Sequence, residues 1–236
     1  DKLAGIDSPG DGIELSESPA FSVVVCTHNG AARIGACLRA LQNLDYPDFE
    51  ILVVDDGSSD DTAEIVRGFS DVRLIESEHE GLGAARNRGA REAQGDIIAY
   101  TDDDCRPDRQ WLWWLAKAFN QGGWDACGGP NLAPRPQSSD DGGASIIDEV
   151  VVASAQGAPS HVLLGDDEAE HLPGCNLAVR KKALEAIGGF SERYLIAGDD
   201  VDFCWRLQQA GFRMGFSAAA FAWHRRRATL WRYFMQ

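Results

Sequence analysis

Three consecutive carboxylates, Asp102, Asp103 and Asp104, are the residues of this sequence whose types and spacing most directly suggest chemistry. They follow residues 97–101, a run typical of a buried strand, and because Asp is depleted inside strands we expect the strand to end here. Three adjacent negative charges repel one another unless a cation lies among them. Oxygen ligands favour Mg²⁺ or Mn²⁺, which leaves positions for phosphate oxygens. A solvated acidic turn is the alternative explanation.

Two other apolar runs, residues 21–26 and 49–54, also lead directly into polar residues. The polar residues concerned are Thr27, His28, Asn29, Asp55 and Asp56. Runs that are apolar on both faces are typical of parallel strands, so these residues are expected at the C-terminal edge of a sheet. A local role as turn formers before Gly57 is the alternative for the acidic pair.

A further acidic pair, Asp199 and Asp200, precedes a predicted helix over residues 201–207 that ends before Gly211. One carboxylate of such a pair can remove a proton from an attacking hydroxyl group. The alternative is that one of the two is only the N-cap of the helix.

The elements around these residues alternate between strand and helix at about 20–30 residues per unit, which predicts a Rossmann-like, doubly wound, mainly parallel sheet. Residues 131–172 are rich in Pro, Gly, Ser and acidic residues, and we expect a mobile acceptor-side loop region there. Residues 1–19 are expected to be a flexible tail or linker. A final helix is expected to begin at residues 229–235, where the sequence stops, so we expect a longer native chain.

Composition narrows the class of protein. The chain has 236 residues, of which 44% are hydrophobic, and a net charge of −15, which argues against nucleic acid as a partner. Its six cysteines form no CxxC pair, and no apolar run approaches the roughly 20 residues that span a bilayer. We expect a cytoplasmic protein. Peripheral contact of the basic residues 225–227 with the cytoplasmic face of a membrane is a further option.

Several motifs, taken in order, resemble a known family. They are Ser22-Val-Val-Val-Cys-Thr-His-Asn29, Val54-Asp-Asp-Gly-Ser-Ser-Asp-Asp-Thr62, Ala84-Ala-Arg-Asn87, Thr101-Asp-Asp-Asp104, Gly174-Cys-Asn176, Gly188-Gly-Phe190 and Gly198-Asp-Asp-Val-Asp202. This series is similar to that of the family 2 glycosyltransferases of GT-A fold, over about residues 20–230.

The resemblance implies an inverting, metal-dependent transfer of a sugar from a nucleoside diphosphate donor, with a UDP-sugar as the first expectation, to a saccharide or lipid-linked acceptor. By position, it implies a donor-binding set of Thr27, His28, Asn29, Asp55, Asp56, Arg86, Asp102 and Asp103. It implies Mn²⁺ or Mg²⁺ bound by Asp102, Asp104 and His224. It implies Asp200 as the general base, with Asp199 as the other candidate. Residues 20–130 would then be the nucleotide-sugar-binding half and residues 131–236 the acceptor-binding half of one domain.

Some points stay open in the sequence. The Gln-x-x-Arg-Trp motif of processive members is not found after Trp205, which favours transfer of single sugars. His224 could be a plain surface histidine, and Arg86 could pair with Glu80 or Glu92. The rival functions are a non-catalytic nucleotide-sugar-binding module and a nucleotidyltransferase of similar topology. The nucleotidyltransferase would need a basic, Gly-rich loop after the first strand.

Overall fold

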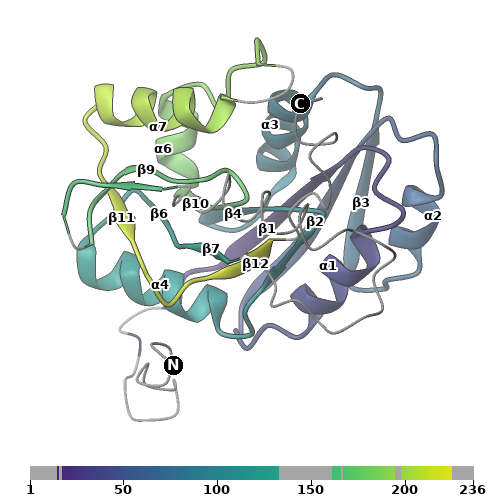
Figure 1. Ribbon diagram of the computed structural model, residues 1–236, viewed down its shortest axis with the longest axis horizontal. Helices are drawn as coiled ribbons and strands as arrows, with labels where there is room; N and C mark the ends of the chain where they lie inside the picture. The colour runs from purple at the N-terminus through teal and green to yellow at the C-terminus, as the bar shows by residue number, and fades with distance from the viewer. Residues whose placement is uncertain (1–14, 16–17, 133–160, 166, 195–197, 225–236) are drawn as a thin grey trace, which may run out of the picture.

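The computed structural model describes residues 15, 18–132, 161–165, 167–194 and 198–224. Most of the expected tail, the centre of the expected loop region, the basic residues 225–227 and the expected last helix lie outside the described residues. Within them, the predicted alternation of strands and helices is confirmed (Figure 1).

The centre of the fold is a seven-stranded sheet with the order β11-β6-β10-β4-β1-β2-β3. Its strands are β1 (Phe21–Thr27), β2 (Phe49–Asp56), β3 (Val72–Ser77), β4 (Ile97–Asp102), β6 (Ala126–Gly128), β10 (Asn176–Arg180) and β11 (Met214–Phe216). Strand β10 runs antiparallel to its neighbours β4 and β6, and every other pairing is parallel. The prediction of a mainly parallel sheet is therefore confirmed.

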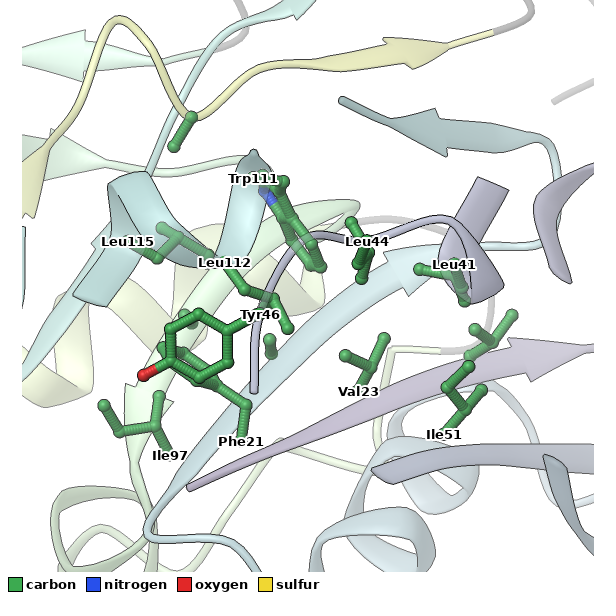
Figure 2. Packing of buried hydrophobic residues seen from close by; sticks show 14 of the residues in the cluster. Phe21, Val23, Leu41, Leu44, Tyr46, Ile51, Ile97, Trp111, Leu112 and Leu115 are labelled. Carbon is green, nitrogen blue, oxygen red and sulfur yellow. The ribbon is translucent and has the colours of Figure 1, made fainter. Parts of the chain in front are cut away.

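Helices cover both faces of this sheet. They are α1 (Ile34–Gln42), α2 (Thr62–Arg67), α3 (Leu82–Glu92), α4 (Trp111–Gly122), α6 (Lys181–Ala186) and α7 (Asp199–Gln209). Alternate strand residues point to opposite faces, which gives two apolar cores. One core joins β1, β2 and β4 to α1 and α4, and includes Phe21, Val23 and Trp111 (Figure 2). The other packs the opposite face against α3, α6 and α7.

A second, smaller sheet was not predicted. It has the order β5-β12-β7, formed by Cys105–Pro107, Ala222–His224 and Asn131–Leu132. A strand of three residues that contains a proline shows no alternation in the sequence, which is why β5 was missed. A hairpin of β8 (Val162–Leu163) and β9 (Ala169–His171) occupies part of the region expected to be loop.

Two helical glycines provide a test of the packing of this fold. A Cβ at Gly89 of α3 would lie 2.4 Å from Val24 Cγ1, whereas a Cβ at Gly35 of α1 would have no neighbour closer than 3.5 Å. We expect Gly89→Ala to lower the free energy of unfolding by about 1–3 kcal/mol through overpacking. We expect Gly35→Ala to raise it by about 0.5–1 kcal/mol through lower backbone entropy of the unfolded chain. Urea unfolding of both variants measures the difference, and equal effects would contradict the close packing of α3 on β1.

Candidate functional site

The C-terminal ends of β1, β2 and β4 place the predicted polar residues along one edge of the sheet. Thr27 lies opposite Asp55 in the β1–β2 ladder, and Cys26 lies opposite Asp102 in the β1–β4 ladder. Because neighbouring parallel strands end at the same edge, residues that are far apart in sequence meet there. This edge is the candidate functional site.

The loop after β1 is bound to the loop after β2. Asn29 is the one described residue other than glycine with a positive φ, 51°, and its backbone N–H donates to Ser58 Oγ at 2.8 Å. Its side-chain oxygen accepts the Ser59 N–H at 2.9 Å. His28 Nδ1 lies 2.8 Å from the Asp56 carbonyl oxygen, and its ring stacks on His79 with centroids 4.2 Å apart. His28 and Asn29 remain exposed, so they lie at the solvent-facing side of this edge.

Asp55 and Asp56 are buried beneath these loops and hold them in place. Asp55 accepts the Ser58 N–H at 3.0 Å, which is the turn-forming contact that the local alternative expected. Asp56 accepts the backbone N–H groups of Glu80 and Gly81 at 2.8 and 2.9 Å. The carboxylates at the end of β2 therefore position the β3–α3 connection as well as their own turn.

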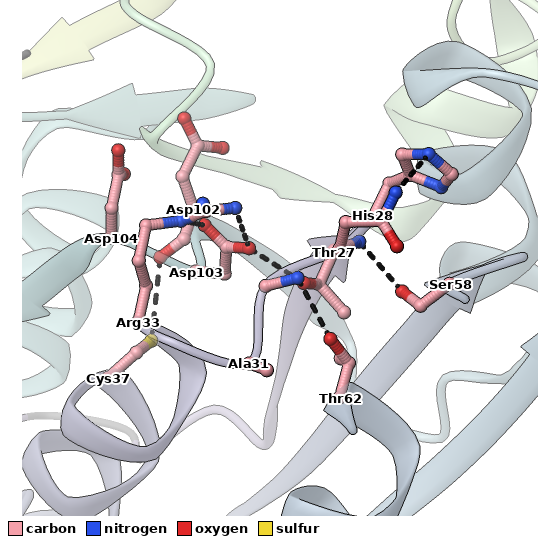
Figure 3. A network of polar contacts seen from close by, with 12 residues as sticks. Thr27, His28, Ala31, Arg33, Cys37, Ser58, Thr62, Asp102, Asp103 and Asp104 are labelled. Atoms are coloured by element: carbon pink, nitrogen blue, oxygen red, sulfur yellow. Dashed lines mark hydrogen bonds and ion pairs between the residues drawn. The ribbon is translucent and has the colours of Figure 1, made fainter. Parts of the chain in front are cut away.

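Asp103 differs from its two acidic neighbours because its carboxylate is bound inside the protein. Thr27 Oγ1 donates to it at 2.6 Å, and Arg33 donates two hydrogen bonds at 2.8 and 2.9 Å. Figure 3 shows the carboxylates of Asp102 and Asp104 directed away from this contact. Arg33 was not predicted as a site residue. Its distance of 70 residues from Asp103 left no local signal.

The side chains of Asp102, Asp104 and His224 lie together, away from the contact that Asp103 makes with Thr27 and Arg33. Their ligand atoms all lie within 4.8 Å of one another, and His224 Nε2 is 3.3 Å from Asp104 Oδ1. Burial raises the pKa of Asp102 despite the nearby charge of Arg86. Burial would lower the pKa of His224, but its contact with Asp104 raises the pKa to about 9. Such a concentration of negative charge favours a cation, and the two carboxylates and one imidazole are a donor set that divalent ions accept.

Arg86 connects this carboxylate group to the second acidic pair. Its guanidinium group is 4% exposed, forms a short ion pair with Asp199 and lies 3.5 Å from Asp102 Oδ1. Burial would lower the pKa of Arg86, but the charges of Asp199 and Asp102 hold it above its usual value. The two acidic groups therefore share one site, on either side of a single arginine.

The alternative partners considered for Arg86 were wrong. Glu80 pairs with Arg88 and Glu92 pairs with Arg73, at the exposed side of α3. The N-cap alternative for the acidic pair of α7 was also wrong, because Gly198 holds the N-cap position with a φ of 93°.

Asp199 and Asp200 have different surroundings. Asp199 is 4% exposed and its carboxylate is bound to Arg86. The Asp200 side chain is 26% exposed, accepts the Gly174 N–H at 3.0 Å and lies 3.8 Å from His171 Nε2. Burial would raise the pKa of Asp200, but His171 and the Gly174 N–H lower it to about 2. Asp200 is thus an ionised carboxylate with partial access to solvent, and His171 is a neighbour that no local pattern in the sequence indicated.

The segment from Gly174 to Asn176 closes the site around Arg86. A Cβ at Gly174 would lie 2.5 Å from a guanidinium nitrogen of Arg86, so only glycine lets the chain pass here. Asn176 accepts the Trp111 indole N–H at 2.8 Å and donates to the carbonyl oxygen of Ala220 at 2.9 Å. Trp111 itself is fully buried, so it packs in the core as well as binding Asn176.

Comparisons with known proteins agree on one family. Residues 22–188 match the model for glycosyl transferase family 2. The glycosyltransferase AglE of Haloferax volcanii is 34% identical over 215 residues, which are 86% of this chain and 66% of that protein. A pre-mycofactocin glycosyltransferase of Mycobacterium tuberculosis is 30% identical over 223 residues, or 89% of this chain and 43% of that protein. The chain thus spans about two thirds or less of the length of these curated relatives.

Solved structures show the same fold. The mannosyltransferase PcManGT from Pyrobaculum calidifontis, in complex with GDP-Man and Mn²⁺, has a TM-score of 0.66 and 24% identity over 89% of this chain and 58% of that one. TarS of S. aureus, in complex with UDP-GlcNAc, has a TM-score of 0.67 and 20% identity over 88% and 59%. The GT-A fold prediction is confirmed. Among the helices that the structure describes, none combines the length and the apolar character needed to cross a membrane.

The buried ion pair of Arg86 predicts a large effect of its removal. Arg86→Met leaves Asp199 buried without a partner, which should lower the free energy of unfolding by about 3–5 kcal/mol. Arg88→Met is the matched control on the same helix. Its pair with Glu80 is exposed, so we expect a loss below about 1 kcal/mol. Denaturant unfolding measures both, and equal losses would show that Arg86 does not hold the site together.

Proposed function

Because the chain belongs to glycosyl transferase family 2, we propose that it transfers a single sugar from a nucleoside diphosphate donor to an acceptor hydroxyl group, with inversion at the anomeric carbon. The observation that supports this most strongly is the convergence of the 102–104 carboxylates, His224 and the 199–200 pair around Arg86. A transferase needs its leaving-group site and its base in one cleft, because the hydroxyl must attack from the face opposite the diphosphate.

The metal-ligating side chains at the edge of the sheet fit a hard divalent cation. Asp102, Asp104 and His224 would hold Mn²⁺ or Mg²⁺, with two carboxylates balancing the charge of the ion. A bound ion supplies neutralisation of the negative charge that develops on the leaving diphosphate. The Mn²⁺ in the complex of the Pyrobaculum mannosyltransferase supports this assignment for the shared fold.

Thr27 and the exposed His28 and Asn29 would border the nucleoside, and the Thr27 hydroxyl group is held by its hydrogen bond to Asp103. The buried Asp55 and Asp56 would offer their remaining acceptor positions to the base or ribose. Residues 20–130 thus form the donor half. A UDP-sugar is the donor we propose. Structural neighbours carry UDP-GlcNAc and GDP-Man, so both bases belong in the test.

Residues 131–236 would supply the acceptor side, for a saccharide or lipid-linked acceptor. Asp200 would accept the proton of the attacking hydroxyl group, because it is ionised and partly exposed. Asp199 would act through Arg86, since its carboxylate is already bound there. The six buried, unpaired cysteines support a cytoplasmic location.

Metal-dependent donor binding is the first test. We expect UDP to bind at least tenfold more tightly with Mn²⁺ than without it, and Asp102→Asn to remove that difference. Asp45→Asn, at an exposed residue outside the site, is the control and should leave it unchanged. Isothermal titration calorimetry with UDP and GDP measures the dissociation constants. If Mn²⁺ enhanced neither, the proposed donor site would be wrong.

The role of Asp200 is the second test. Asp200→Asn keeps the size of the side chain but removes the base, so we expect unchanged donor affinity and a loss of transfer of about 10²–10⁴-fold. Asp202→Asn, two residues further along the first turn of α7, is the control. Release of nucleoside diphosphate over a panel of saccharide acceptors, with the anomeric configuration of the product read by NMR, gives the result. Near-normal turnover of Asp200→Asn would assign the base elsewhere, and a chain that binds UDP-sugar without any turnover would be a binding module.

A further inference from the structure

A second group of metal-ligating side chains lies beside the carboxylate site. It consists of Cys105, Cys175 and His224, whose ligand atoms all lie within 4.8 Å of one another. The three residues come from β5, from the turn before β10 and from β12. Nothing in the proposed transfer reaction uses the two thiols.

We propose that Cys105, Cys175 and His224 form a second cation site, selective for a thiophilic divalent ion such as Zn²⁺ or Cd²⁺, and that it shares His224 with the carboxylate site. The inference goes beyond the proposed function. The existence of the thiol site stands on its own geometry, and only its competition with the carboxylate site rests on the proposed transferase.

The backbone holds the three ligands in place. Cys105 lies directly opposite His224 in the antiparallel ladder of β5 and β12. Cys175 is fixed by the next residue, Asn176, whose side chain donates to the carbonyl oxygens of Pro130 and Ala220 at 3.2 and 2.9 Å. Since Ala220 lies just before β12, the same hydrogen bonds hold the Cys175 turn against the strand that carries His224.

The donor chemistry selects the class of ion. Two sulfur atoms and one imidazole nitrogen suit Zn²⁺, with metal–sulfur distances of about 2.3 Å and metal–nitrogen distances of about 2.0 Å. A tetrahedral ion needs its ligand atoms about 3.5–3.8 Å apart, so no pair would have to move together by more than about 1 Å. Two thiolates would also balance the charge of a divalent ion in a place where Cys105 is 0% and Cys175 is 7% exposed.

The surroundings of Cys175 support a ligand role. The Asn131 side-chain amide donates to Cys175 Sγ at 2.8 Å, the type of contact that orients a metal ligand. The His224 side chain is 33% exposed and gives a metal ion access from the solvent.

Sharing of His224 makes the two sites exclusive. His224 Nε2 lies 3.3 Å from Asp104 Oδ1, and Cys105 Sγ lies 3.8 Å from the same oxygen, so two ions bound at once would be close enough to repel each other strongly. An ion held by the thiols would therefore displace the ion of the carboxylate site. Zn²⁺ at low concentration would then act as an inhibitor that competes with Mn²⁺.

Cd²⁺ alone is the probe that tests the site. We expect one equivalent of Cd²⁺ to produce thiolate-to-metal charge-transfer absorption in the near ultraviolet, and Cys105→Ser and Cys175→Ser to lose it. Cys127→Ser removes a buried thiol outside the group and should retain the absorption. Asp102→Asn should retain the absorption as well. The ¹¹³Cd NMR shift of the wild-type protein, which reports sulfur ligation, decides the matter if a cysteine variant does not fold. Absence of the absorption, or an oxygen-type shift, would overturn the proposal.

Competition is measured by titrating Zn²⁺ into the protein with UDP and Mn²⁺. We expect Zn²⁺ to remove the Mn²⁺-dependent gain in UDP affinity, and Cys175→Ser to require at least tenfold more Zn²⁺ for the same effect. Equal sensitivity of wild type and Cys175→Ser would overturn the shared use of His224. A protein that binds Cd²⁺ through thiols but shows no Mn²⁺ effect on UDP would retain this site and lose the proposed function, so the two failures are distinguishable.

Discussion

A buried guanidinium group is the interaction on which the rest of this site depends. Arg86 has lost almost all of its contact with water, so it must be neutralised within the protein. Asp199 and Asp102 provide that neutralisation from two elements that are distant in sequence. The end of β4 and the start of α7 are therefore fixed on either side of α3. The position of Gly174, where no side chain fits over the guanidinium group, follows from the same constraint.

The two acidic runs, residues 102–104 and 199–200, share one arrangement. In the 102–104 trio, the central Asp103 binds Thr27 and Arg33, and its neighbours are directed away from this contact. In the 199–200 pair, Asp199 binds Arg86 and Asp200 stays partly exposed. One carboxylate in each run is bound by other side chains, and the adjacent one is left for the proposed chemistry. Adjacent residues suit this arrangement because consecutive side chains leave the backbone in different directions.

His224 belongs to two groups of metal-ligating side chains, one with carboxylates and one with thiols. Carboxylate oxygens and thiol sulfur atoms each lie within 4.8 Å of a ring nitrogen of this histidine. The choice between a hard and a soft cation then depends on the relative affinities of the two ligand sets and on the concentrations of the two ions. The small sheet that brings β5 and β12 together creates both possibilities at once.

The sequence by itself determined the main strands, the alternation that makes the sheet mainly parallel, and the positions of the acidic groups at strand ends. Those features are local, since an apolar run followed by Asp or Gly shows both a strand and its end. It did not determine the small sheet, the antiparallel direction of β10, the partners of Arg86 or the presence of Arg33 and His171. Arg86 and Asp199 are 113 residues apart, and no local pattern couples them. Only the tertiary structure decided which carboxylate of each run is buried, because burial depends on what the rest of the chain packs against it.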